Sequence, residues 1–299
     1  MFFVDLKKLG ISNGITCRDD LYEMKLLEEL SVSPEVSSMT EKLYDDLLPI
    51  FKEKRDRRNP TMYGNIFSRS YNIDIDYSND KIFGLVNKIT YLIYDMKSYD
   101  EVDAYYHQMF FRSGYDNDDK NNIFIYATIL SYNGEIDKQY FVRILSHELM
   151  HAFQDSKILY FQTSNLYQKA TNISLFTKNE NIRNLGYLIY LLDKREIDAN
   201  MQSIYNEMKT KNLETYKMKK DHINICYNIY KSMSNEEIQE ALNIFGISLS
   251  KLNHLIEIGI EYFNYRVGKV YTSFLMNKNN KIKEELDRMK QLMNYNYLK

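Results

Sequence analysis

At residues 144–153 the sequence reads ILSHELMHAF, and this stretch decides the fold and the chemistry that we predict. Apart from its two histidines and one glutamate, every residue in it is uncharged. We expect a helix that begins near Asp137 and runs to about Asp155. On a helix, His147 and His151 are four residues apart and project from the same face, about one turn from each other.

The residue between these histidines completes a recognisable chemical unit. Two imidazole nitrogens on one helix face can bind a Zn²⁺ ion at about 2.0–2.1 Å each. Glu148 directly follows His147, so its carboxylate would stand beside the ion without being a ligand and could deprotonate a metal-activated water. The alternative interpretation is structural, with one histidine satisfied in the core and the other at the surface.

The segment resembles the active helix of the zincin metallopeptidases, which carries His-Glu-x-x-His within an uncharged frame. The resemblance implies one Zn²⁺ ion, a polypeptide substrate and hydrolysis of peptide bonds with Glu148 as the general base. It also implies that the apolar strand predicted at 123–130 is the edge strand beside the active helix. An extended peptide would then add to that edge by β-augmentation.

A third protein ligand would leave the fourth metal position open. The metzincin branch would need a histidine where this chain has Lys157, which excludes that branch. The gluzincin branch takes a glutamate from a later helix, and Glu196 in the stretch REIDAN is the best candidate, with the small Ala199 allowing close helix packing. Glu196 could instead be a surface carboxylate. The other candidate ligands are Glu180, Asp193 and Asp155.

The groups around such an ion are less well defined. Thermolysin-like members carry an aspartate four residues after the ligand glutamate, whereas this chain has Asn200, whose amide accepts a hydrogen bond more weakly. Asp198 is an alternative for orienting a histidine, although it falls on a different helix face. A donor that stabilises an oxyanion is also expected. The candidates are His107, Tyr187 and Tyr190, and the sequence does not choose among them.

The remaining sequence favours an α+β fold that is mostly α. Only 10 Gly and 3 Pro occur, too few for the many tight turns of an all-β fold. Apolar and polar residues alternate from Tyr71 to Tyr77, which predicts a strand with one wet face. We expect a zincin-like core, a small sheet plus the motif helix, over 61–208. A helical segment, 1–60, would precede it, and a helical region, 209–299, would follow or form one continuous domain with it.

Further elements are expected from periodicity and capping signals. Ser234 and Glu237 fit a capping box, and the polar residues 115–122 suggest a loop. The predicted helices are 19–30, 34–58, 81–96, 98–112, a short one near 159–169, 184–208, 249–276 and 281–294.

Composition limits the classes of function. The 39 Lys+Arg and 41 Asp+Glu leave a formal net charge of −2, which argues against a strongly basic nucleic-acid binder. No 18 apolar residues run together and no secretory signal is apparent, so we expect no membrane partner and a cytoplasmic protein at synthesis. The alternative to an enzyme is a catalytically silent zincin-like structural or interaction protein, such as a virion or assembly component.

Overall fold

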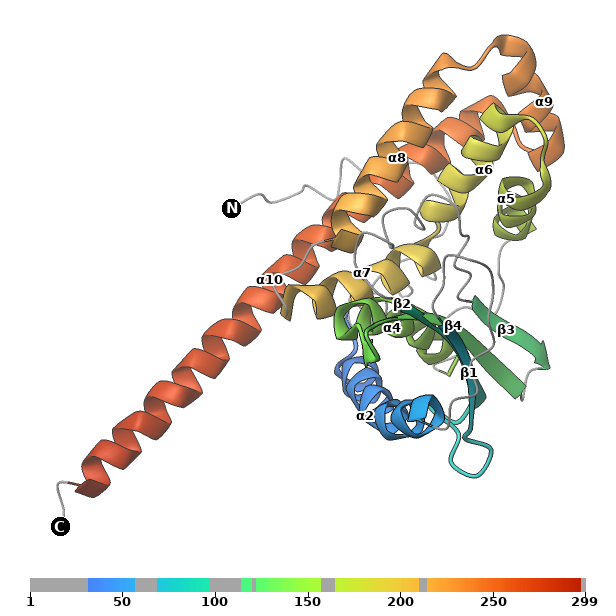
Figure 1. Ribbon diagram of the computed structural model, residues 1–299. Helices are drawn as coiled ribbons and strands as arrows, with labels where there is room; N and C mark the ends of the chain where they lie inside the picture. Colours follow the sequence, from blue (N-terminus) through green and yellow to red (C-terminus); the bar gives the residue numbers. More distant parts are fainter. Residues whose placement is uncertain are drawn as a thin grey trace.

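A small mixed sheet and two helices form one half of the protein (Figure 1). The computed structural model describes residues 32–56, 69–96, 114–119, 122–156, 165–209 and 214–296. In the sheet, β2 and β4 are parallel, the other pairs are antiparallel, and the order is β1-β2-β4-β3 with β5 also pairing with β4. The strands are β1 (Arg69–Asp76), β2 (Val86–Met96), β3 (Gly114–Asp119), β4 (Asn122–Tyr132) and β5 (Glu135–Ile136).

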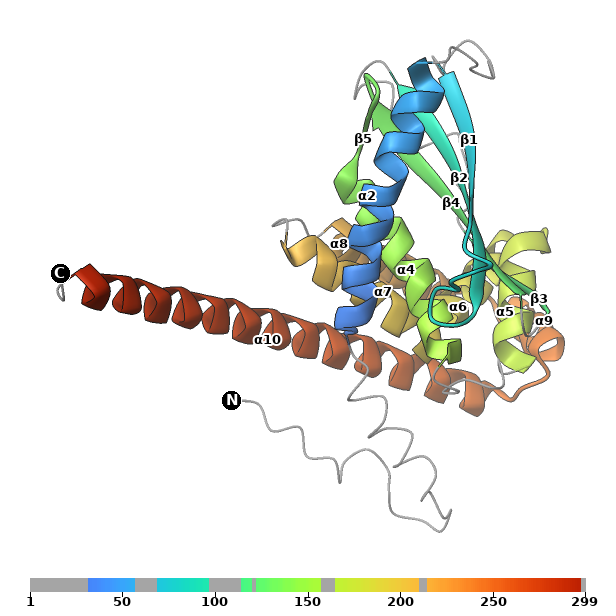
Figure 2. The same cartoon turned by 90° about the horizontal axis from the view of Figure 1, so that it is seen from below.

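Helices make up most of the described chain, which confirms the prediction of a mostly helical α+β fold. The helices α2 and α4 lie by the sheet, and the C-terminal part of α10 extends away from the rest (Figures 1 and 2). The bounds are α2 (Pro34–Asp56), α4 (Lys138–Ser156), α5 (Asn165–Phe176), α6 (Glu180–Leu191), α7 (Lys194–Lys209), α8 (Glu214–Ser232), α9 (Asn235–Phe245) and α10 (Leu249–Asn296).

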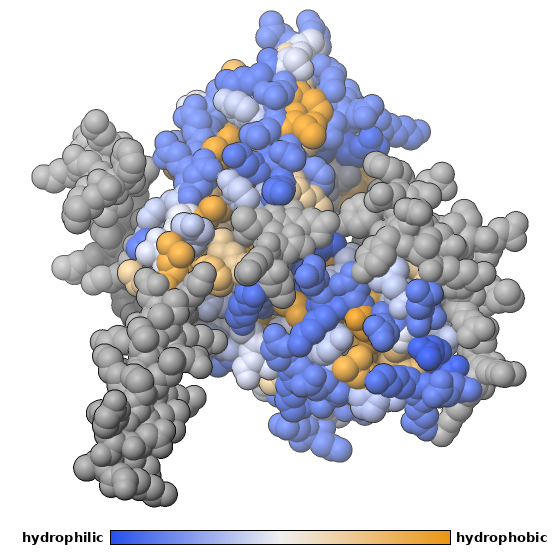
Figure 3. Space-filling view, turned by 60° about the vertical axis from the view of Figure 1, so that its left-hand side comes forward, coloured by the Kyte–Doolittle hydropathy of each residue, from blue (hydrophilic) through white to orange (hydrophobic). Residues whose placement is uncertain are grey.

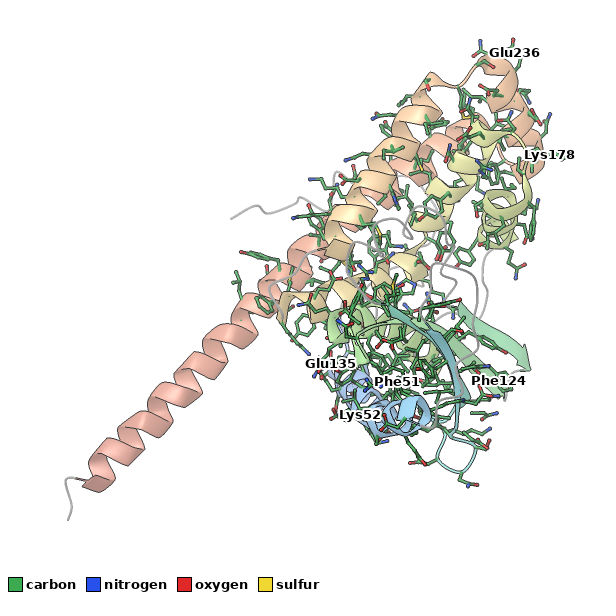
Figure 4. All side chains as sticks on the ribbon, in the orientation of Figure 1. Phe51, Lys52, Phe124, Glu135, Lys178 and Glu236 are labelled. Carbon is green, nitrogen blue, oxygen red and sulfur yellow. The ribbon has the colours of Figure 1, made fainter. Side chains whose placement is uncertain are left out.

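The first hydrophobic core fills the space between the sheet, α2 and α4. Along β1, Tyr71 and Ile73 are buried while Asn72 and Asp74 are exposed, so the predicted alternation is confirmed. Phe51 of α2, labelled in Figure 4, is 1% exposed and meets Tyr71 edge-on, with ring centroids 5.3 Å apart. This contact holds the sheet against α2, and α4, which carries the motif, packs into the same core.

A second hydrophobic core is built from α5 to α10, and α7 lies between the two cores. Ala199 of α7 belongs to the first core, whereas Ile197, Met201 and Ile204 belong to the second. The helix α10 approaches the α6–α7 junction closely at Gly259, where a Cβ would lie 2.7 Å from the Cβ of Leu192. A larger residue at that position would require α10 or Leu192 to shift.

Two predicted elements near the sheet were wrong. Residues 86–96, predicted within a helix, form β2, because their β-branched and aromatic side chains alternate between buried and partly buried positions over most of the strand. The polar run predicted as a loop contains β3, whose backbone pairs with β4. Because β4 pairs with β2 on one side and with β3 and β5 on the other, β4 lies inside the sheet and β3 is the edge strand next to it.

The other helical predictions that fall on described residues are confirmed in type, with different limits. The predicted helix 184–208 is two helices, α6 and α7, separated where the Asp193 side chain accepts a hydrogen bond from the Arg195 backbone N–H at 2.9 Å. The two predicted C-terminal helices form the single helix α10, and the capping box of Ser234 and Glu237 at α9 is confirmed. The predicted helices 19–30 and 98–112 lie outside the described residues.

The surface drawn in Figure 3 is mostly hydrophilic, with apolar side chains in small separate groups. Among the described helices, none is long and apolar enough to cross a membrane.

Candidate metal centre

The helix α4 places the motif between the sheet and α7. It begins at Lys138, where the Asp137 side chain accepts a hydrogen bond from the Tyr140 backbone N–H at 2.9 Å. Leu145 and Leu149 on α4 are fully buried in the first core. The periodicity that buries these leucines turns the histidines toward α7, the helix with which α4 packs most extensively.

Three side chains from α4 and α7 converge on one point. The Nε2 atoms of His147 and His151 are 3.3 Å apart. The Oε1 atom of Glu196 is 3.2 Å from His147 Nε2, and its Oε2 atom is 3.4 Å from His151 Nε2. In a tetrahedral zinc site with bonds of about 2.0–2.1 Å, two ligand atoms are separated by about 3.3–3.4 Å. The spacing of the three groups therefore fits three ligands of one tetrahedral ion.

The surroundings of Glu196 also fit a bound cation. Its side chain is 1% exposed, and neither carboxylate oxygen has a hydrogen-bond partner of good geometry among the described residues. Burial by itself would raise the pKa of Glu196, but the neighbouring imidazoles of His147 and His151 hold that pKa well below its usual range. A buried carboxylate in its charged form needs a compensating positive charge, and a divalent ion between these three residues would provide it.

Glu148 lies beside the three converging side chains and is only 7% exposed. Burial raises the pKa of Glu148 from its ordinary value of 4.5 to about 7, while the nearby His151 opposes the rise and Glu196 adds to it. A general base works best when its pKa is close to the operating pH, because it can then both accept and return a proton. The burial of Glu148 therefore brings its pKa close to neutral pH.

The partner of His151 is a residue that the sequence analysis missed. The Nδ1 atom of His151 lies 3.2 Å from the amide oxygen of Gln154, and the Gln154 amide N–H donates to the backbone carbonyl of Arg195 at 3.3 Å. Gln154 thus orients the imidazole and connects α4 to the start of α7, next to Glu196. A glutamine three residues after a motif histidine was the available signal. Asn200 is buried, but among the described residues no hydrogen bond joins it to either imidazole.

Asp198 faces away from the histidines and pairs with α10. Its Oδ1 atom is 2.7 Å from Nη2 of Arg266 and accepts a hydrogen bond from the Tyr262 hydroxyl at 3.2 Å. Arg266 also donates to that hydroxyl at 3.1 Å, and both charged side chains are 1% exposed. Because Asp198 is two residues from Glu196, this buried network fixes the ligand-bearing turn of α7 to the C-terminal helix.

The other candidate ligands have partners elsewhere. Asp155 forms an ion pair with Arg195 at 3.0 Å, and Asp193 caps the start of α7. Glu180 is 76% exposed at the start of α6 and lies 3.8 Å from Arg183. In the described residues, the geometry of a metal site is found only for the group of His147, His151 and Glu196.

Tyrosine rings cover one side of the centre. Tyr190 stacks between Tyr187 and Tyr167, at ring-centroid distances of 6.0 and 5.6 Å. Burial and then the Glu196 carboxylate raise the pKa of Tyr190, of Tyr167 and of Tyr187. The Tyr187 hydroxyl is instead 3.4 Å from Nδ1 of His222. Tyr167 was not singled out from the sequence, and His107 lies outside the described residues.

Polar contacts lock α7 in place away from the ligands. Ser203 donates to the backbone carbonyl of Arg143 on α4 at 2.8 Å. Gln202 accepts from the backbone N–H of Ser33, and its amide N–H donates to the Ser37 hydroxyl at the start of α2. These buried bonds define the register of α7 against α4, and hence where Glu196 meets the two histidines.

The chain was also compared with known protein families, curated proteins and solved structures. None of these comparisons yielded a match.

Proposed function

We propose that this protein is a zinc-dependent metallopeptidase that hydrolyses peptide bonds. The observation that carries the proposal is the triangle of His147, His151 and Glu196, whose separations of 3.2–3.4 Å suit a tetrahedral ion, with Glu148 directly beside it. Two neutral imidazoles and one carboxylate are a ligand set of catalytic zinc sites, which keep one position open. That the bound ion is zinc is part of this proposal.

A bound zinc ion would polarise the substrate carbonyl and lower the pKa of water at the site. In the proposed reaction, the Glu148 carboxylate accepts the proton of the attacking water and later donates it to the leaving amine. Its pKa of about 7 suits both transfers. Gln154 holds His151 through Nδ1, so that Nε2 points to Glu196. Burial of Glu196 and the tyrosine rings limits the access of competing solvent.

Substrate would bind along the sheet. The edge strand beside β4 is β3, and β3 also contacts α4. An extended peptide could add to this edge through backbone hydrogen bonds, a mode that places its carbonyl groups in a regular row near the motif helix. The strand that would bind substrate is therefore β3 and not β4, the strand predicted from the sequence.

The test combines metal analysis with one substitution. Protein purified without added zinc should contain one zinc per chain, both as wild type and as Glu148→Gln. Wild type should cleave an unfolded polypeptide, and Glu148→Gln should lose at least about 10²-fold in rate. The exposed Glu236→Gln, far from the centre, is the matched control and should behave as wild type.

Two outcomes would contradict the proposal. Protein that binds no divalent metal at His147, His151 and Glu196 has no site for the chemistry. Stoichiometric zinc without cleavage of any unfolded polypeptide or peptide mixture would favour the silent, structural alternative.

A further inference from the structure

One lysine of α8 lies on the face of that helix that packs against α6 and against α7, the helix that carries Glu196. At the start of α8, Thr215 is bonded to the Glu207 carboxylate of α7, through its hydroxyl at 2.6 Å and its backbone N–H at 2.9 Å. Further along, His222 contacts Tyr187 of α6. Residues four and three apart share a helix face, so Lys219, between Thr215 and His222, lies on the same inward stripe.

The charges around Lys219 agree with this placement. Burial lowers the pKa of Lys219, whereas the carboxylates of Glu196 and Glu148 raise it and Arg143 lowers it further. In return, Lys219 is among the groups that lower the pKa of Glu148. The Lys219 side chain is partly exposed, and its charge interacts with those of the ligand carboxylate and the proposed base.

Lys219 differs from the other cations near the centre. Arg195 is paired with Asp155, and Arg266 with Asp198. Among the residues that the structure describes, none forms a hydrogen bond or an ion pair with Lys219. The donors of its ammonium group therefore remain available for a further acceptor.

We propose that Lys219 is a catalytic residue that donates a hydrogen bond to the substrate carbonyl oxygen as that oxygen becomes negatively charged. This inference rests on the proposed function. When the water oxygen attacks the carbonyl carbon, the electron pair of the double bond moves to the carbonyl oxygen, and the proton of the water goes to Glu148. When the pair returns, the C–N bond breaks and the amine leaves with the proton from Glu148. Lys219 keeps its protons throughout and stabilises only the charge.

The tyrosines are weaker candidates for this role. The Tyr187 hydroxyl already contacts His222, and the hydroxyl of Tyr190 lies beside Glu196, where a second negative charge is disfavoured. A cation is also a stronger donor to an oxyanion than a neutral hydroxyl. Loss of one such donor typically lowers kcat by about 10²–10³-fold.

The experiment compares Lys219→Met and Lys219→Arg with Lys217→Met, an exposed control on the same helix. Circular dichroism and thermal unfolding establish that each variant folds. Lys219→Met should lower kcat by about 10²-fold with KM within a few-fold, and Lys219→Arg should recover part of the loss. Zinc affinity should not fall in Lys219→Met, because Lys219 is not a ligand.

A binding measurement makes the test independent of turnover. A peptide phosphonate, whose tetrahedral anion resembles the charged intermediate, should bind zinc-loaded Lys219→Met at least about 10-fold more weakly than Lys217→Met. If both variants bind the phosphonate and turn over substrate equally, the role of Lys219 is overturned while the peptidase proposal stands. If wild type neither cleaves peptide nor binds the phosphonate, both proposals are overturned. Binding that depends on Lys219 without cleavage of any peptide would overturn the peptidase proposal and, with it, the catalytic role of Lys219.

Discussion

Replacing Glu148 with glutamine should stabilise the metal-free protein above neutral pH. The carboxyl group is buried, and its pKa is raised from 4.5 to about 7. A carboxyl with a higher pKa in the folded than in the unfolded state keeps its proton longer in the folded state. The folded state therefore loses relative stability as the pH rises from about 4.5 through about 7. Glutamine has nearly the same shape and never ionises, so it removes this loss.

The size of the effect follows from the two pKa values. The difference between 4.5 and about 7 is equivalent to about 3 kcal/mol of unfolding free energy. At pH 8 without metal, Glu148→Gln should therefore unfold with a free energy about 3 kcal/mol larger than wild type. At pH 4, where both side chains are neutral, the two proteins should be equally stable within about 1 kcal/mol.

The assay is urea unfolding followed by circular dichroism, from pH 4 to pH 9 in the presence of a chelator. Glu236→Gln, exposed on α9, is the control and should follow wild type at every pH. Parallel stability curves for wild type and Glu148→Gln would refute the reasoning, because they would show that Glu148 ionises in the folded protein as easily as in the unfolded chain.

Three further predictions concern the ligands and their supports. Glu196→Ala should abolish stoichiometric zinc binding. When free zinc is 100 times its dissociation constant, it should raise the unfolding free energy of wild type by about 2.7 kcal/mol, and a chelator should remove this gain in urea titrations. Gln154→Ala should weaken zinc binding by about 10–100-fold in competition with a chromogenic chelator, because it frees the His151 ring. Arg266→Met should cost about 3–5 kcal/mol of stability by leaving Asp198 buried without its partner, and the double variant with Asp198→Asn should recover part of that loss.

Each of the three predictions has an outcome that would contradict it. Zinc retained by Glu196→Ala would move the third ligand to another residue. Unchanged zinc affinity in Gln154→Ala would mean that the ring of His151 is held by packing alone. Equal stability of Arg266→Met and wild type would mean that water or another group compensates Asp198.

The sheet shows where local patterns are insufficient. The alternation in β1 was clear because its outward residues are polar. The strand β2 has apolar or aromatic residues at both inward and outward positions, so its sequence was compatible with a helix. Whether β4 or β3 forms the edge depends on pairing between strands, which no single strand encodes.

The sequence by itself determined the spacing of His147 and His151, because the pitch of a helix places residues four apart on one face whatever surrounds them. The tertiary structure alone decided that Glu196 meets them, that Asp198 turns instead to Arg266, and that the face of α8 with Lys219 packs against α6 and α7. Helical geometry is a property of each short segment. The approach of α7, α8 and α10 to α4 depends on the packing of two hydrophobic cores and on buried polar bonds between distant residues.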